Sequence, residues 1–185
     1  TELLWGRPLR SILSIYNNKV LPFNYGHLKS CDFTVIEKNL DRKNKKIKSF
    51  NEYQLFLKNN DIILDQKERR RKIISKFESV CRSKMYKNIF DERLLDEVIN
   101  IVEDPNVLLI EFHKDYLDIP KEIIISTLQN HQRYFPLFDS KDNLTNAFFV
   151  VANKTDSKNL IKEGNKKVVE ARLSDAKFFW DKDRS

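Results

Sequence analysis

The most unusual run of side chains able to do chemistry is Asn130-His131-Gln132-Arg133-Tyr134-Phe135. It gathers amide, imidazole, guanidinium and phenol groups at the predicted joint between a helix and a strand, where polar side chains can meet a ligand. His131 and Arg133 could contact a phosphate or a base, and Tyr134 could be a stacking platform for a base. The alternative is structural, because imidazole and guanidinium groups favour a helix C-terminus and can satisfy its last carbonyls.

Two basic stretches add further candidate contacts to RNA. Residues 41–48 form a polar, basic segment that we expect to be an exposed loop, and a helix predicted from Asp65 to about Met85 has a strongly basic face. The candidates are Arg42, Lys43, Lys45 and Lys46 in the loop and Lys67, Arg69, Arg70 and Arg71 on the helix; Lys72 and Lys76 lie on the same predicted face. The alternative is that both stretches are simply solvated surface.

Several kinds of reaction centre are not supported by the residue spacing. The histidines are His27, His113 and His131, which form neither an HExxH nor an HxxxH pair, and Cys31 and Cys81 form no CxxC pair. Gly6, Gly26 and Gly164 are isolated, so they cannot build a glycine-rich phosphate loop. No GxSxG elbow occurs. We therefore expect no catalytic residue, no metal ligand and no bound cofactor on this chain.

Composition favours a folded, basic protein with a polyanionic partner. The chain has 185 residues, of which 41% are apolar and 33% charged, so it can form a core. Its net charge of +7 favours nucleic acid as a partner. No apolar run approaches the ~20 residues that a bilayer requires, and because the first residues lack a charged start followed by an apolar core we expect no signal peptide. We therefore expect no membrane association and a cytoplasmic location.

The elements that must position these side chains alternate between strands and helices. We expect a β-hairpin at 9–23 (or a helix over 9–16), a largely helical section at about 50–104, and a short strand at 61–64. Ser49 or Asn51, Asp65, and Asp91 are the expected N-caps of that section. The second half predicts strands at 107–112, 134–138 and 144–153, a helix at 120–130, and a closing helical region at 158–184, capped by Asp156 or Ser157, with Gly164 near a break. The fold class is α+β, a mixed β-sheet with flanking helices, in a single domain spanning 1–185.

A longer series of motifs resembles a known family. The run 130–135 is followed by Phe148-Phe149-Val150-Val151-Ala152-Asn153, by Gly164-Asn165-Lys166-Lys167-Val168 and by Ala171-Arg172-Leu173-Ser174-Asp175-Ala176-Lys177-Phe178-Phe179-Trp180. Earlier segments agree, namely Arg7-Pro8-Leu9-Arg10, Val20-Leu21-Pro22-Phe23, Lys29-Ser30 and Leu94-Leu95-Asp96-Glu97-Val98. In this order they resemble the beta subunit of bacterial heterotetrameric glycyl-tRNA synthetase. One departure is Ile36-Glu37-Lys38-Asn39, which stands where the family usually has Gly-His-Arg-Phe.

The resemblance implies a piece of a longer chain, similar in fold to the B3/B4 region of the phenylalanyl-tRNA synthetase beta chain. It implies a tRNA-binding and scaffolding role, with ATP, magnesium and glycine handled by an alpha subunit and tRNA(Gly) as the nucleic-acid partner. Two alternatives stay open. One is a hydrolytic editing domain, which glycine, the smallest amino acid, makes hard to justify because no smaller competitor exists. The other is a structural module that docks the alpha subunit through the apolar helix ending near Trp180.

Overall fold

The computed structural model describes residues 9–38, 41–87 and 91–184. The chain divides into two compact units, Thr1–Ile62 and Ile63–Ser185, whereas the sequence predicts a single domain spanning 1–185. We describe each unit by itself. The predicted α+β class is confirmed, because small sheets and helices occur in both units.

The first unit is built from short strands and one helix. Its elements are β1 (Ile12–Leu13), β2 (Ile15–Tyr16), β3 (Lys19–Val20), β4 (Asn24–Tyr25), β5 (Leu28–Cys31), β6 (Phe33–Lys38), β7 (Asp41–Lys46) and α1 (Phe50–Lys58). The β2–β3 pair confirms the predicted hairpin, since Asn17 and Asn18 have φ of 48° and 60°, as a two-residue turn with left-handed backbone requires. The alternative of a helix over 9–16 is wrong.

The basic segment at 41–48 is not a loop. Residues 41–46 form strand β7, which pairs antiparallel with β6 from Phe33↔Lys46 to Lys38↔Asp41. The prediction failed because a strand that is solvated on most of its length has no hydrophobic alternation to reveal it. Among the described residues of this unit the buried apolar side chains are Ile36, Ile47 and Leu57, of which Ile47 alone belongs to the basic segment, just after β7.

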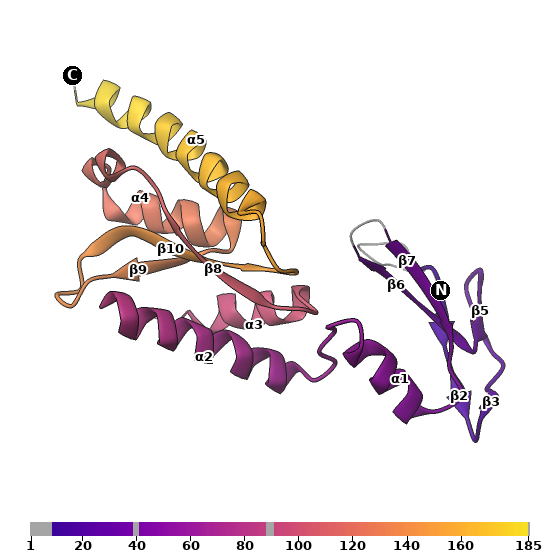
Figure 1. Cartoon of the computed structure of the whole chain (residues 1–185). Helices are drawn as coiled ribbons and strands as arrows, with labels where there is room; N and C mark the ends of the chain where they lie inside the picture. The colour runs from indigo at the N-terminus through magenta and orange to yellow at the C-terminus, as the bar shows by residue number, and fades with distance from the viewer. Residues whose placement is uncertain (1–8, 39–40, 88–90, 185) are drawn as a thin grey trace. The chain divides into compact units, whose positions relative to one another are not determined.

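The second unit is a three-stranded antiparallel sheet between two layers of helices (Figure 1). Its elements are α2 (Gln66–Lys84), α3 (Glu92–Ile101), β8 (Asn106–Glu111), α4 (Lys121–Ser126), β9 (Phe135–Phe138), β10 (Leu144–Ala152) and α5 (Leu160–Asp183), with a 3-10 turn at Lys114–Asp118 and a π-helical turn at Thr127–His131. The strand order is β8-β10-β9. The helix-flanked sheet is thus antiparallel rather than mixed, and the described parallel pair, β1–β5, belongs to the first unit.

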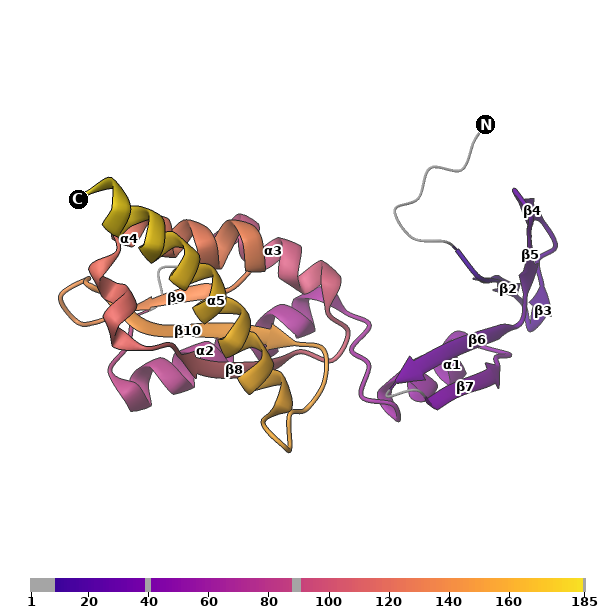
Figure 2. The same ribbon diagram turned by 90° about the horizontal axis from the view of Figure 1, so that it is seen from above.

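Alternation along β10 explains why helices cover both faces of this sheet. Ala147 and Phe149 face the core formed with α2 and α3, and Phe148 and Val150 face the core formed with α4 and α5. The Phe149 ring stacks on Phe77 of α2 at 4.5 Å between centroids. Seen from above in Figure 2, α5 crosses over the strands on the face it shares with α4. A strand that is apolar on both sides is the sequence signature of burial on both faces.

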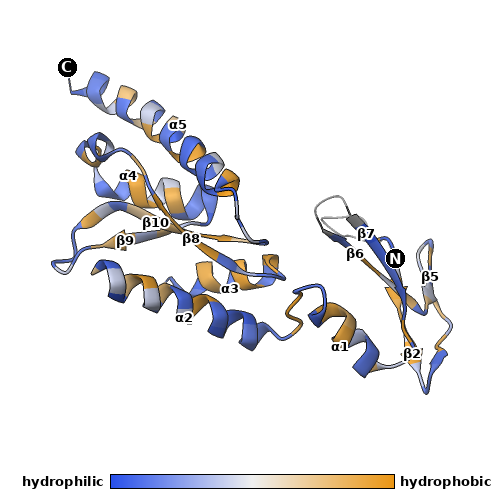
Figure 3. Cartoon of the chain, viewed as in Figure 1, coloured by the Kyte–Doolittle hydropathy of each residue, from blue (hydrophilic) through white to orange (hydrophobic). Residues whose placement is uncertain are grey.

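The predicted caps define the helices of the 50–104 section. Ser49 caps α1, while Asp65 and Asp91 each accept two backbone N–H groups at the start of α2 and α3. Residues 61–64 are not a strand, because they form the irregular link between α1 and α2. Figure 3 shows α2 as mostly hydrophilic, in keeping with its long solvent-facing side. No helix among the described residues is long and apolar enough to cross a membrane.

The closing helix differs from its prediction in one respect. Gly164 lies inside α5 and does not break it. Asp156 supplies the cap from outside the helix, because its carboxylate accepts the N–H groups of Ile161 at 3.1 Å and Lys162 at 2.8 Å. The sequence suggested a break because glycine is a poor helix former, but one glycine costs only about 1 kcal/mol relative to alanine.

Candidate nucleic-acid interface

The basic residues of β7 point to two sides of the strand. Lys43 donates to Asn60 Oδ1 at 3.1 Å, just beyond the C-terminal end of α1. Lys45 lies 3.1 Å from Glu52 Oε1 in the first turn of α1, so these two alternate side chains lie on the side of the strand that faces the helix. Lys46 lies 3.0 Å from Asp32 Oδ2, and Arg42 is exposed. Successive side chains on a strand alternate between faces. The four candidates therefore do not form one continuous basic surface.

Glu52 is the acidic centre of this local arrangement. Its carboxylate accepts the backbone N–H of Lys48 at 2.9 Å, which, together with Lys45, lowers its pKa below the ordinary value. Glu52 in turn donates its own N–H to the capping hydroxyl of Ser49 at 3.2 Å. Lys45 thus helps to hold the first turn of α1 and is already partly neutralised.

Arg69 is held by carbonyl groups rather than exposed to solvent. Its guanidinium donates to Ile99 O at 3.0 Å, to Ile63 O at 2.6 Å and to Leu64 O at 2.9 Å. These bonds tie the first turn of α2 to the C-terminal turn of α3 and to the preceding link. Because the N–H donors of Arg69 already have carbonyl acceptors within the unit, this side chain has a structural role.

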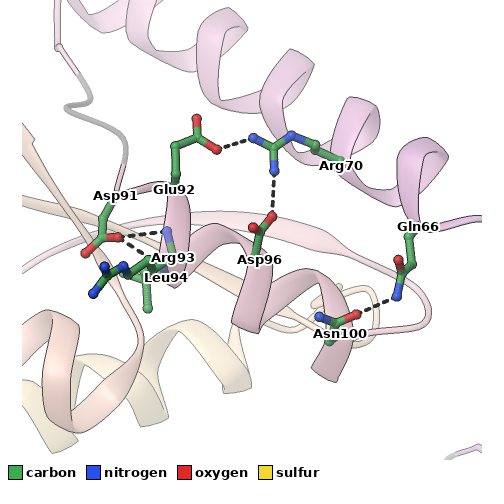
Figure 4. A network of polar contacts seen from close by, with 8 residues as sticks. All are labelled: Gln66, Arg70, Asp91, Glu92, Arg93, Leu94, Asp96 and Asn100. Atoms are coloured by element: carbon green, nitrogen blue, oxygen red, sulfur yellow. Dashed lines mark hydrogen bonds and ion pairs between the residues drawn. The ribbon is translucent and has the colours of Figure 1, made fainter.

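Arg70 bridges α2 and α3 (Figure 4). Its guanidinium donates to Asp96 Oδ1 at 2.8 Å and to the carboxylate of Glu92, whose hydrogen bond is the main cause that raises the pKa of Arg70. Gln66, one turn earlier, donates to Asn100 Oδ1 at 2.6 Å. The sequence predicts Arg70 on the outer face of the helix, with the other cations. That was wrong, since residues 70, 73 and 77 follow an i, i+3, i+7 spacing and share the face that Ile73 and Phe77 bury.

Lys67 and Arg71 keep the positions that the sequence predicted. Both side chains are exposed and lie one turn apart on α2. Of the four α2 candidates, these two are therefore the ones placed to meet a ligand from solvent.

The unusual run 130–135 divides into a structural part and an exposed part. Arg133 has φ of 57°, and its backbone N–H bonds Gln129 O at 3.1 Å, so its backbone closes the helical segment. Its guanidinium reaches Glu97 Oε2 at 3.1 Å, with both side chains about half exposed. His131 is exposed at the end of the π-helical turn. Backbone N–H groups thus satisfy the helix end, in place of the imidazole and guanidinium groups that the structural alternative required, and both side chains lie at the surface.

Tyr134 is a core residue. It is 7% exposed, its ring stacks on Phe148 at 5.3 Å between centroids, and its hydroxyl donates to Asn165 Oδ1 of α5. Burial raises the pKa of this phenol above its usual value. The structure does not support the expected stacking of Tyr134 on a base, because both the ring and the hydroxyl already have partners inside the unit.

The remaining sequence features occupy ordinary structural places. The segment 36–39 differs from the family's usual Gly-His-Arg-Phe. Its Ile36 is buried in β6, and its Glu37 lies 3.5 Å from Arg10 in an exposed ion pair. Asn39 and the residues Arg7 and Pro8 of the first motif lie outside the described residues. No group of three or more His, Cys, Asp and Glu residues that could hold a metal occurs among 9–38, 41–87 and 91–184.

Comparison with known proteins explains the motif series. The family model described as the glycyl-tRNA synthetase beta subunit matches residues 1–185. The chain belongs to the glycyl-tRNA synthetase beta subunit family. A relative named glycine–tRNA ligase beta subunit from Dictyoglomus turgidum is 35% identical over 183 residues, covering 98% of this chain and 27% of the relative. One from Rickettsia peacockii is 37% identical over 183 residues, covering 98% of this chain and 28% of the relative.

Two family motifs meet in the structure of this glycyl-tRNA synthetase beta family chain. The run 130–135 and the segment 164–168 are joined through Tyr134 and Asn165, and the 148–153 segment supplies Phe148 beneath the tyrosine ring. The chain spans a little over a quarter of the length of these relatives. Three of the motifs that carried the resemblance therefore contribute to the core between the sheet and α5.

Proposed function

We propose that this chain is the tRNA-binding and scaffolding part of a glycine–tRNA ligase beta subunit. In this proposal ATP-dependent charging of tRNA with glycine takes place on an alpha subunit, which also handles ATP and magnesium, and the protein works in the cytoplasm. The observation that carries the proposal is the family match over residues 1–185, with relatives named glycine–tRNA ligase beta subunit over 98% of the chain. The likeness to the B3/B4 region belongs to the same proposal.

Charge and exposure support a role in holding RNA. The net charge of +7 attracts a phosphate backbone without sequence preference. Exposed cations are available at Arg42, Lys67 and Arg71, and His131 adds an exposed imidazole. Arg69, Arg70 and Tyr134 are committed to contacts within the second unit, so we leave them out of the proposed contact set.

Charge reversal on one exposed helix face tests this function. In the intact protein, Arg71→Glu should weaken binding of a fluorescein-labelled tRNA transcript by about five- to tenfold and reduce the slope of log K against log salt by about one. Lys167→Glu is the matched control, because it makes the same charge change at an exposed position of α5. Equal losses in the two variants, or a wild-type protein that fails to bind the transcript, would contradict the proposal.

One observation favours docking of a partner subunit as a second role. Phe178 and Phe179 of α5 are 63% and 62% exposed and form an edge-to-face pair at 5.4 Å between centroids. Exposed aromatic pairs are typical of the centre of protein interfaces. We propose the alpha subunit as the occupant, because the relatives are named as beta subunits.

Co-purification tests this second role. Phe179→Ser should reduce capture of the alpha subunit by the intact beta chain, whereas Lys182→Ser, a few residues further along α5, should leave it unchanged. Unaltered capture of the alpha subunit by Phe179→Ser would assign these rings to another part of the protein.

A further inference from the structure

A basic groove runs along one side of α2 and includes none of the exposed cations proposed above as RNA contacts. It has a volume of about 360 Å³ and lies between the middle of α2 and the start of β8, both within the second unit. Four of its lining residues come from α2, two from the beginning of β8 and one from the position before that strand: Lys72, Ser75, Lys76, Ser79, Asn106, Val107 and Pro105. No acidic residue lines it.

The positive charge of this groove rests mainly on Lys76. Lys72 lies 3.3 Å from Asp104 Oδ1, so its charge is partly balanced. Within the described part of the chain no ion pair or hydrogen bond engages the Lys76 side chain, which is exposed at the groove. An ammonium group in this position can approach an anion without first giving up a carboxylate.

Two hydroxyl groups lie beside that ammonium. Ser75 and Ser79 are one helical turn apart, and neither hydroxyl forms a side-chain hydrogen bond to another described residue. Hydroxyls and lysine ammonium groups are the usual side-chain donors to phosphate oxygens in nucleic-acid complexes. Serine side chains are also short, so they let a backbone approach the helix closely.

The groove offers phosphate contacts without the means to read a base. Its lining contains no aromatic ring on which a base could stack. The amide of Asn106, the group best suited to a base edge, already donates to Lys154 O at 3.2 Å. The chemistry therefore fits the sugar–phosphate backbone, whose contacts fix position rather than sequence.

The wall opposite α2 belongs to β8, which pairs with β10, and one side chain also holds the segment that leads into it. Asn153, at the end of β10, accepts the backbone N–H groups of Glu103 at 2.7 Å and Asp104 at 2.9 Å through its Oδ1. On the other side Ile73 and Phe77 anchor α2 in the core with no exposed surface. The backbone that carries the groove's donors is thus held in place before a ligand arrives, so binding has to order only the side chains themselves.

We propose that this groove binds a phosphate of the RNA backbone, with the Lys76 ammonium and the Ser75 and Ser79 hydroxyls as its donors. The inference rests on the proposed RNA-binding function and deepens it by naming a second contact. At about 100° per residue of this helix, Lys76 lies on the side of α2 opposite Lys67 and away from Arg71, so the prediction that these cations share one face is wrong. The groove therefore contacts a stretch of backbone different from the one that Arg71 meets.

Three variants of the intact protein and a labelled tRNA transcript test the groove. Lys76→Glu should weaken binding about five- to tenfold and lower the salt slope by about one. Ser79→Asp, which adds a negative charge at the groove, should produce a comparable loss, and Ser79→Ala a smaller one. Lys167→Glu, outside the groove, controls for the change in net charge, and circular dichroism should show unchanged helix content in every variant.

The outcomes separate this inference from the function on which it rests. If wild-type protein binds the transcript and Arg71→Glu weakens it, but Lys76→Glu and Ser79→Asp do not, the groove is not a contact and the function stands. If wild-type protein does not bind the transcript, both fail. Inorganic phosphate at constant ionic strength should not displace the transcript, because one ion cannot replace several contacts. Displacement at low phosphate concentration would instead assign the groove to a small anion and overturn the inference.

Discussion

The hydroxyl of Tyr134 donates a hydrogen bond to Asn165 Oδ1, and this bond links the strand side of the second unit to α5. Asn165 also donates through Nδ2 to Ile161 O at 2.6 Å, so its amide is fixed within the helix. The tyrosine ring rests on Phe148 in the sheet. Together with the backbone N–H of His113, which donates to Glu170 Oε1 at 3.0 Å, this contact helps to fix where the closing helix lies on a largely apolar face.

Removal of this hydroxyl should destabilise the second unit. Tyr134→Phe leaves the ring in place but deprives the partly buried Asn165 of its donor, which should lower the free energy of unfolding by about 1–2 kcal/mol. Chemical denaturation of the purified protein measures the effect. Tyr16→Phe is the control, because Tyr16 is 77% exposed and should change stability little. A Tyr134→Phe protein as stable as wild type would contradict the structural role given to this bond.

The adjacent residues Arg70 and Arg71 should separate stability from RNA binding. Arg70→Ala removes the bridge to Glu92 and Asp96 and should cost about 1 kcal/mol of unfolding free energy, a modest value because the carboxylates are well exposed. Arg71→Ala should leave stability within about 0.5 kcal/mol but weaken tRNA binding. Denaturant titration and fluorescence anisotropy measure the two quantities. Arg71→Ala being the less stable variant would refute this assignment.

Gly164 offers a stabilising substitution. A Cβ at this position would meet no atom within 4 Å, and the residue lies in the interior of α5. Gly164→Ala should therefore raise the free energy of unfolding by about 0.5–1 kcal/mol, since it reduces the backbone freedom of the unfolded chain. Thermal denaturation should show the rise. A stabilised variant that loses tRNA binding would mean that a ligand approaches the backbone at this glycine.

The cap of α2 predicts a dependence of stability on pH. The backbone N–H groups of Glu68 and Lys67 lower the pKa of Asp65 below its ordinary value of 3.8. A carboxyl whose pKa is depressed by folding stabilises the native state above the unfolded pKa, and this contribution is lost as pH falls through the folded pKa. Asp65→Asn should therefore be less stable than wild type near neutral pH.

The difference between Asp65→Asn and wild type should shrink as the solution is acidified below the unfolded pKa. Melting temperatures of the two proteins across the acid range measure it. Glu68→Gln serves as the control, because it removes a nearby charge and leaves the cap intact. A difference that stays constant down to the acid limit would show that the charge of Asp65 contributes nothing.

The elements that local sequence determined are those with a cap and a long apolar stripe. Asp65 and Asp91 set the starts of α2 and α3, and the apolar run around Phe148 and Phe149 set a strand buried on both faces, because capping and side-chain periodicity act over a few residues. The motif series likewise determined the family, since it depends only on residue order.

Tertiary structure decided which basic side chains are available. Arg70 and Arg71 are neighbours of the same charge, yet one is bound to two carboxylates of α3 and the other is exposed. It also decided that Tyr134 belongs to the core and that Lys76 lies beside two hydroxyls and the start of β8. These outcomes depend on packing, which brings together residues that are far apart in the sequence. A local sequence pattern does not show which distant residues will be in contact.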